Sequence, residues 1–178
     1  MSQLLLENEY ANSLSNVTGD IYYHLPLLRS LATEVNHVTE MGTRWGESTR
    51  AFLAAPCVFR AYDIELNDHA SYVFDIARNM GKDVQYIKAD TLNLEIEETD
   101  LLFIDTEHTY DQLSQELKIH GNKARKYLAF HDTEYCAAQL CPAIFEFLRD
   151  NPLWRIKYHT RENNGLTVLE RTDGRRYI

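Results

Sequence analysis

The sequence has little basic charge, few glycines and prolines, and no long apolar run. Its 18 lysines and arginines face 27 acidic residues, for a formal net charge of −9. Because nucleic acids and anionic membranes attract basic surfaces, we expect neither as a partner. The chain lacks the stretch of about 18 apolar residues that a transmembrane helix needs, and its acidic start lacks the basic segment of a signal peptide. We therefore expect a cytoplasmic protein.

Two fingerprints of α/β enzymes are also missing. The sequence contains no Gly-x-Ser-x-Gly segment, which argues against an α/β-hydrolase. It contains no Gly-x-Gly-x-x-Gly segment, the fingerprint of nicotinamide-dependent enzymes. An NAD(P)-dependent oxidoreductase still stays open as an alternative, because it also needs glycine after its first strand and an acid after its second. The three cysteines, an odd number, predict no disulfide framework.

The length of 178 residues predicts one domain with a sizeable core. Turn-forming residues are frequent between Asn12 and Asp20, so we interpret residues 1–20 as a loose N-terminal arm. Residues 21–178 would form the folded domain. It opens with apolar residues at helical spacing between Leu25 and Val35.

Strand and helix patterns then alternate along the chain. Apolar runs predict strands over residues 37–41, 58–64, 84–89, 100–105 and 127–131. Helical spacing predicts helices over residues 48–55, 70–77, 110–117 and 143–148. Two last strands, over 154–159 and 166–170, flank an Asn-Gly turn and predict a hairpin. This alternation predicts an α/β fold, with a doubly wound, mostly parallel sheet between two layers of helices.

Every predicted parallel strand ends beside an acidic residue. In chain order these strand ends carry Glu40, Asp63 with Glu65, Asp90, Asp105 with Glu107 and His108, and His131 with Asp132. The carboxyl ends of parallel strands share one edge of the sheet, and that edge is where ligands bind in such folds. An aspartate at one such position often only caps a helix, but five acidic strand ends on one edge predict a binding site.

The segment from Glu40 to Ser48 connects the first strand to the first helix of the sheet. It contains Gly42 and Gly46, which allow a tight turn and a close approach to a ligand. Ser48 is placed to cap the helix, whose free N–H groups favour a nucleotide-like ligand. We interpret Trp45, between the two glycines, as a packing residue.

Three segments resemble class I S-adenosylmethionine-dependent methyltransferases, in particular small metal-assisted O-methyltransferases. They are the Glu-x-Gly-x-x-x-Gly-x-Ser pattern from Glu40 to Ser48, the Ile-Asp-x-x-His-x-Tyr segment from Ile104 to Tyr110, and the pair His131-Asp132. The resemblance implies a single-domain, Rossmann-like methyltransferase fold with seven strands, one of them antiparallel. Two departures are Thr106, where the family usually has glycine, and the absence of a Gly-Gly pair before the fifth strand.

The resemblance implies S-adenosylmethionine as cofactor. Acidic residues suit its sulfonium cation, and a carboxylate accepts hydrogen bonds from both ribose hydroxyls. We expect Glu40 near the methionine moiety, Asp63 ahead of Glu65 at the ribose, and Asp90 with Thr91 near the adenine amino group. The expected cofactor-binding residues are Glu40, Gly42, Thr43, Gly46, Ser48, Asp63, Glu65, Asp90, Thr91 and Asp105.

A second constellation is expected to carry the reaction. The carboxylates of Asp105 and Asp132 and the imidazole of His131 are suited to a divalent cation, either Mg²⁺ or Mn²⁺. The cation would bind a substrate hydroxyl and lower its pKa. His108 is the candidate general base, because the ordinary pKa of histidine is near neutral. We thus expect Asp105 and His108 to be the catalytic residues.

The sequence therefore predicts an enzyme that methylates a hydroxyl of a small molecule with S-adenosylmethionine, assisted by a divalent cation. Besides the oxidoreductase, a non-catalytic binding module with the methyltransferase fold stays open as an alternative. A homodimer is expected as the assembly, since small members of the family often pair.

Overall fold

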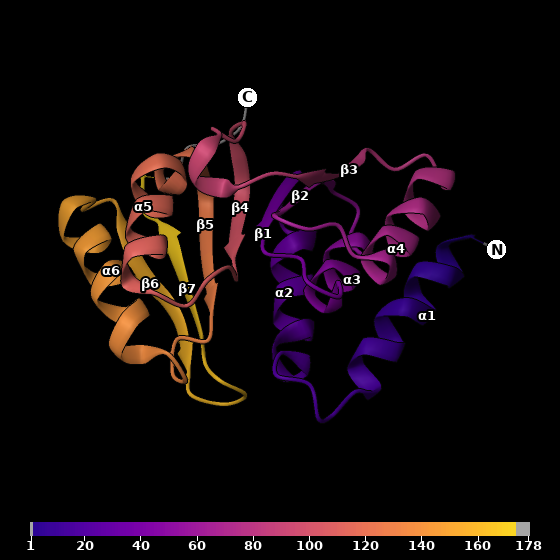
Figure 1. Ribbon diagram of the computed structural model, residues 1–178, viewed down its shortest axis with the longest axis horizontal. Helices are drawn as coiled ribbons and strands as arrows, with labels where there is room; N and C mark the ends of the chain where they lie inside the picture. The colour runs from indigo at the N-terminus through magenta and orange to yellow at the C-terminus, as the bar shows by residue number, and fades with distance from the viewer. Residues whose placement is uncertain (1, 174–178) are drawn as a thin grey trace.

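The computed structural model describes residues 2–173, which fold around one seven-stranded sheet (Figure 1). The strands lie in the order β3-β2-β1-β4-β5-β7-β6. Strands β1 to β5 are parallel, whereas β7 is antiparallel to both β5 and β6. The expected doubly wound sheet with one antiparallel strand is thus confirmed.

The strands lie close to where the apolar runs predicted them. They are β1 (His37–Met41), β2 (Val58–Asp63), β3 (Val84–Lys88), β4 (Thr99–Ile104), β5 (Ala124–His131), β6 (Trp154–Thr160) and β7 (Leu166–Arg171). Strand β4 is buried along its whole length, as its unbroken apolar run requires. The largest difference is that β5 begins three residues before the expected Tyr127.

The helices form two layers, one on each face of the sheet (Figure 1). They are α1 (Ser2–Ser15), α2 (Leu25–Thr33), α3 (Glu47–Leu53), α4 (Asp68–Asn79), α5 (Tyr110–His120) and α6 (Ala137–Asp150). Short 3₁₀ helices are η1 (Tyr22–His24) between α1 and α2, η2 (Thr91–Asn93) between β3 and β4, and η3 (Gly121–Lys123) between α5 and β5. Among residues 2–173, no helix is both long and apolar enough to cross a membrane.

The side chains of β4 separate the two halves of the core. Leu101 and Phe103 pack with residues of α1 to α4, whereas Leu102 and Ile104 pack with α5 and α6. Successive side chains of a strand point to opposite faces, so one apolar strand supplies both layers. Both faces of the sheet are therefore fixed against helices, which makes its carboxyl edge a rigid base for a site.

The expectation of a loose arm is wrong for residues 2–15. Helix α1 packs against α3 and α4, with Leu6 and Tyr10 buried. Arg50 on α3 forms an ion pair with Glu9, at 3.1 Å between Nε and Oε2. The apolar residues of α1 are spread around the helix, with Leu4 and Leu5 exposed, so the sequence shows no helical periodicity there. Helix α1 is therefore stabilised by its packing against α3 and α4, which the sequence pattern does not indicate.

Candidate active site

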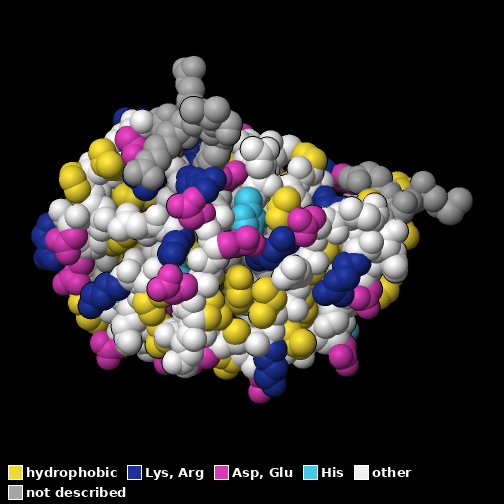
Figure 2. All heavy atoms as spheres, turned by 90° about the horizontal axis from the view of Figure 1, so that it is seen from above, with side chains coloured by type: hydrophobic (Ala, Val, Ile, Leu, Met, Phe, Trp, Pro, Cys, Tyr) yellow, Lys and Arg dark blue, Asp and Glu magenta, His cyan; other side chains and the backbone are white. Residues whose placement is uncertain are grey.

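The carboxyl edge of the sheet holds two adjoining cavities. The larger, of about 640 Å³, lies between the α1–α2 link, the loop after β1 and the ends of β4 and β5. The smaller, of about 520 Å³, lies between the ends of β2, β3 and β4. Both are lined by Gly42, Arg44, Asp105 and Thr106. The strand ends that the sequence singled out therefore share a single hollow edge. At the opposite edge, seen from above in Figure 2, acidic and basic side chains are interspersed.

Gly42 brings the loop after β1 against the end of β4. Its φ of +83° lies in the left-handed region, and a Cβ there would lie 1.9 Å from the carbonyl oxygen of Asp105. The N–H of Gly42 donates to the carbonyl of Tyr62 at 2.9 Å. Gly46 also has positive φ and is the N-cap of α3. Only glycine fits at Gly42, so the two cavities meet at a point fixed by backbone contact.

Glu40 and Ser48 contact each other behind this loop. The Glu40 carboxyl is fully buried and accepts hydrogen bonds from Ser48 Oγ at 2.5 Å and Thr49 Oγ1 at 2.6 Å. Burial raises the pKa of Glu40 to about 8. Glu40 lines neither cavity, so the structure places its side chain behind the loop and not at the cavity surface. The expected cap at Ser48 is wrong, because Gly46 holds that position and the Ser48 hydroxyl donates to Glu40.

Asp63 lines the smaller cavity and holds the glycine loop. Its Oδ2 accepts the N–H groups of Thr43 and Arg44, both at 2.8 Å. Its Oδ1 accepts the N–H of Glu65 at 3.0 Å. The exposed Glu65 side chain lines neither cavity. Of the two expected ribose ligands, the structure thus places only Asp63 at a cavity.

The far wall of the smaller cavity is a hydrogen-bonded cluster centred on Glu116 of α5. This fully buried carboxyl accepts hydrogen bonds from Thr91 Oγ1 at 2.6 Å, Thr106 Oγ1 at 2.9 Å and Gln112 Nε2 at 3.0 Å. Asp90 lines the same cavity and caps η2 through the N–H of Leu92. Thr106, which replaces the family's glycine, has its hydroxyl satisfied by Glu116. Sequence reasoning missed Glu116 and Gln112, although their i, i+4 spacing was visible.

The three expected cation ligands converge. One ligand atom from each of Asp105, His131 and Asp132 lies within 4.8 Å of the other two. His131 Nδ1 lies 3.0 Å from Asp132 Oδ2 and 3.4 Å from Asp105 Oδ2. Asp132 has a positive φ of 56°, and this turns its side chain back toward the end of β4. His131 and Asp132, although adjacent in sequence, thereby face the same point.

The orientation of His131 fits a cation. Its Nε2 lies 2.9 Å from the carbonyl oxygen of Asp20, which only accepts, so Nε2 carries a proton. In the neutral imidazole the lone pair then stands on Nδ1, which is buried and has no aligned hydrogen bond. Without a cation, the carboxylates of Asp105 and Asp132 raise the pKa of His131 to about 10 against the effect of burial, so Nδ1 carries a proton between them. A bound cation would take the place of that proton. The donor set therefore suits a divalent ion.

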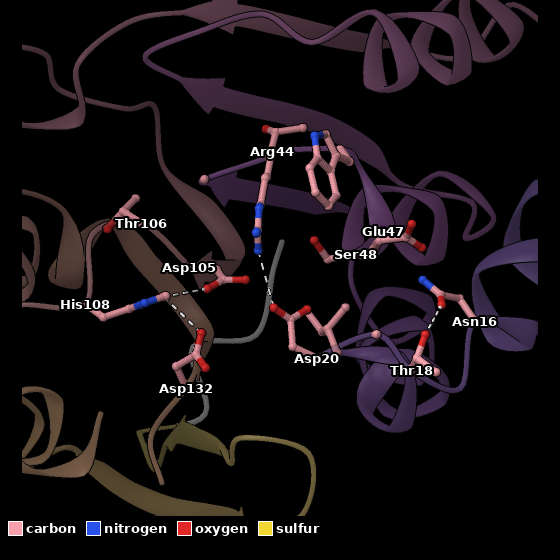
Figure 3. A pocket seen from close by; sticks show the side chains of 15 residues that line it. Asn16, Thr18, Asp20, Arg44, Glu47, Ser48, Asp105, Thr106, His108 and Asp132 are labelled. Carbon is pink, nitrogen blue, oxygen red and sulfur yellow. Dashed lines mark hydrogen bonds and ion pairs between the residues drawn. The ribbon is translucent and has the colours of Figure 1, made fainter. Parts of the chain in front are cut away.

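His108 stands between the same carboxylates from the other side (Figure 3). Its Nε2 lies 2.9 Å from Asp132 Oδ2 and 3.2 Å from Asp105 Oδ1. Hydrogen bonds to Asp105 and Asp132 raise the pKa of His108 to about 10. In return, the two imidazoles hold the pKa of Asp132 well below its usual range, against the effect of burial. The expectation of a near-neutral pKa for His108 is therefore wrong as long as no cation neutralises the two carboxylates.

The α1–α2 link forms the side of the larger cavity that the sequence did not indicate (Figure 3). Asp20 extends its carboxylate toward Arg44, with 3.3 Å between Oδ2 and Nη1. The Arg44 guanidinium also lies over the ring of Trp45, 4.7 Å from its centroid. Trp45 is 56% exposed, so its interpretation as a packing residue is wrong. The residues missed at this cavity are Asn16, Thr18, Gly19, Asp20, Ile21, Arg44 and Glu47.

No protein-family model and no curated protein matches the sequence. Solved structures with the same architecture do exist. A candidate caffeoyl-CoA O-methyltransferase from Staphylococcus aureus is 16% identical with a TM-score of 0.64, and the match covers 84% of this chain and 83% of that one. The N-methyltransferase NodS from Bradyrhizobium japonicum, solved with S-adenosylhomocysteine, is 15% identical with a TM-score of 0.63, covering 97% and 99%.

A third similar structure is a 1,6-didemethyltoxoflavin-N1-methyltransferase from Burkholderia thailandensis, solved with bound 1,6-didemethyltoxoflavin and S-adenosylhomocysteine. It is 13% identical with a TM-score of 0.61, and the match covers 96% of this chain and 87% of that one. The likenesses extend over nearly the whole of each chain. They show that this chain has the fold of the class I S-adenosylmethionine-dependent methyltransferases.

Proposed function

We propose that this protein transfers the methyl group of S-adenosylmethionine to a hydroxyl of a small molecule, with Mg²⁺ or Mn²⁺ at Asp105, His131 and Asp132. The observation that carries the proposal is the convergence of these three side chains. Asp105 lines both cavities, Asp132 lines the larger one, and His131 is buried beside them. Solved structures of the same fold hold S-adenosylhomocysteine. The cation distinguishes this proposal from methyl transfer to nitrogen.

The smaller cavity has the groups that an adenosine moiety needs. Asp63 offers carboxylate oxygens at the end of β2, in reach of a ribose, and Asp90 and Thr91 line the cavity beyond it. The larger cavity then takes the methionine moiety and the acceptor molecule. Its four acids, Asp20, Glu47, Asp105 and Asp132, favour the sulfonium cation and disfavour an anionic acceptor.

Methyl transfer forms a carbon–oxygen bond while the carbon–sulfur bond breaks, and the hydroxyl proton must leave. S-adenosylmethionine supplies the electrophilic methyl group, and a divalent cation supplies the charge that makes the hydroxyl acidic. Asp105, His131 and Asp132 would hold that cation, and His108, which lines the larger cavity, would take the proton. A base must be neutral, and His108 would be neutral once the charges of Asp105 and Asp132 were balanced by the cation and not by His108 itself. The remaining catalytic task is to position the two reactants.

Two measurements test the proposal. Calorimetry should detect S-adenosylhomocysteine binding to the wild-type protein, and binding of NADH instead would favour an oxidoreductase. Methyl-labelled S-adenosylmethionine should then label neutral hydroxyl-bearing acceptors in the presence of Mn²⁺, and Asp132→Asn should abolish this labelling. Cofactor binding with no labelling of any acceptor, with or without Mn²⁺, would leave a binding module and contradict the enzyme. Labelling that chelators and Asp132→Asn leave unchanged would contradict the role of the cation.

A further inference from the structure

The α1–α2 link reaches the cation site through a backbone atom. The carbonyl oxygen of Asp20 lies 2.9 Å from Nε2 of His131, and the His131 side chain is almost completely buried. This contact holds the imidazole ring in one orientation, with Nδ1 facing Asp105 and Asp132. Contacts of this kind orient metal-binding histidines in proteins. The position of the Asp20 backbone therefore controls the orientation of the His131 ring, 111 positions later in the chain.

Asn163, in the loop between β6 and β7, holds the link in that position. Its Nδ2 donates to the carbonyl of Gly19 at 2.9 Å, and its Oδ1 accepts the N–H of Tyr23 at 3.1 Å. Its own carbonyl accepts a hydrogen bond from Nε2 of His24 at 3.0 Å. One asparagine thus makes three hydrogen bonds, to residues that lie before and after Asp20 in the sequence. In Figure 1 the α1–α2 link and the β6–β7 loop both lie at the lower edge of the molecule.

The β6–β7 loop is itself fixed to the segment that follows the cation ligands. The carbonyl of Asn164 accepts the N–H groups of Glu134 and Tyr135, at 2.8 and 2.9 Å. A Cβ at Gly165 would lie 2.4 Å from the Glu134 nitrogen. The loop therefore connects the backbone just after Asp132 with the α1–α2 link, and His131 lies between them.

We propose that Asn163 and the backbone of Asp20 are positioning residues for the cation site, because together they hold His131 with Nδ1 turned toward Asp105 and Asp132. This inference rests on the proposed function, since it concerns the same site. The side chain of Asn163 lines neither cavity and touches none of the three ligand side chains by a described contact. Its side chain acts on the cation through Gly19, Asp20 and Tyr23. Its carbonyl contacts His24, whose ring packs edge-on against that of His131, 5.6 Å between centroids.

The test is a pair of glycine variants in one loop. Asn163 and Asn164 both have positive φ, 46° and 69°, so glycine relieves the backbone at either position. Asn163→Gly removes the two side-chain hydrogen bonds to the link and keeps the carbonyl bond to His24. Asn164→Gly is the matched control, since the contacts described for Asn164 are made by its carbonyl. Thermal unfolding of both variants shows whether each remains folded.

Mn²⁺ affinity is measured by electron paramagnetic resonance, S-adenosylhomocysteine affinity by calorimetry, and the Nε2–H signal of His131 by ¹⁵N NMR. We expect Asn163→Gly to weaken Mn²⁺ binding by about 10-fold, the loss typical of disturbing a contact to a metal ligand. The Nε2–H signal of His131 should weaken, with cofactor affinity unchanged. Asn164→Gly should change none of the three.

An Asn163→Gly variant with the wild-type Mn²⁺ affinity and the wild-type Nε2–H signal of His131 would overturn this inference and leave the proposed function intact. Absence of Mn²⁺ binding to the wild-type protein would overturn both. Equal losses of Mn²⁺ and cofactor binding in the two variants would show a general effect of the loop and would overturn the positioning role.

Discussion

Gly42 and Asp105 are in backbone contact: a Cβ on Gly42 would lie 1.9 Å from the carbonyl oxygen of Asp105. This contact joins the loop of the proposed cofactor site to the first of the proposed cation ligands. The carbonyl of Asp105 belongs to the chain just past β4 and has no room to move away, because β4 is buried along its length. Both proposed sites therefore share one rigid point.

The first prediction concerns this contact. Gly42→Ala should lower the free energy of unfolding by about 3 kcal/mol or more, because it adds a steric clash to an unfavourable φ. Gly81→Ala is the matched control, since Gly81 has nearly the same φ, +77°, with no atom within 4 Å of the added Cβ. That variant should lose only about 1 kcal/mol. Urea unfolding measures both, and equal losses would contradict the close contact.

The second prediction concerns the pH dependence of stability. Glu40 has a pKa of about 8 in the folded protein, above the ordinary value of 4.5. The folded state therefore holds a proton that the unfolded state releases, so this group's contribution to stability falls as pH rises from about 4.5 to 8. The slope approaches about 1.4 kcal/mol per pH unit.

Glu40→Gln removes the titrating group and should flatten the urea-unfolding profile over this range relative to wild type. Glu65→Gln, which changes an exposed carboxylate on the same edge, should leave the profile unaltered. A Glu40→Gln profile parallel to the wild-type profile would show that Glu40 is ionised in the folded protein.

A third prediction concerns the cluster behind the smaller cavity. Glu116→Ala leaves the hydroxyls of Thr91 and Thr106 and the amide of Gln112 without their buried acceptor. We expect a loss of about 3 kcal/mol in the free energy of unfolding, as for other buried polar groups deprived of a partner. Affinity for S-adenosylhomocysteine should fall as well, because Thr91, Thr106 and Gln112 line that cavity. Glu107→Ala, at an exposed position on the same edge, serves as the control for stability.

The fourth prediction separates the roles of His108 and Asp132 within the proposed function. His108→Gln should slow methyl transfer by about 100-fold or more, the usual contribution of a general base, while Mn²⁺ still binds. Asp132→Asn should instead lose Mn²⁺ binding itself. Labelled methyl transfer and electron paramagnetic resonance distinguish the two. His69→Gln, on the exposed side of α4, should alter neither. Normal transfer by His108→Gln would exclude His108 as the base.

The accuracy of the sequence-based predictions differs between the strands and the chemistry of the site. Strand positions were predictable because an apolar run such as that of β4 has no stable alternative to burial between helices. The shared edge of the acidic strand ends was also predictable, because parallel strands bring their carboxyl ends to one edge of the sheet. The protonation of His108 was not predictable, because it depends on two carboxylates that lie at 2.9 and 3.2 Å only in the folded chain.

By itself, the sequence determined the doubly wound sheet, the glycine turn at Gly42 and the position of Asp105, His131 and Asp132 at strand ends on one edge. Local hydrophobic patterns and strand direction are enough to fix these, whereas the positive φ that turns Asp132 toward the other two was decided by the folded chain. Only the tertiary structure decided that α1 is a packed helix, that Glu40 lies behind the loop, and that the carbonyl of Asp20 orients His131. These three features depend on contacts between different segments of the chain. No periodic pattern in the sequence marks such contacts, so only the packing of the folded chain reveals them.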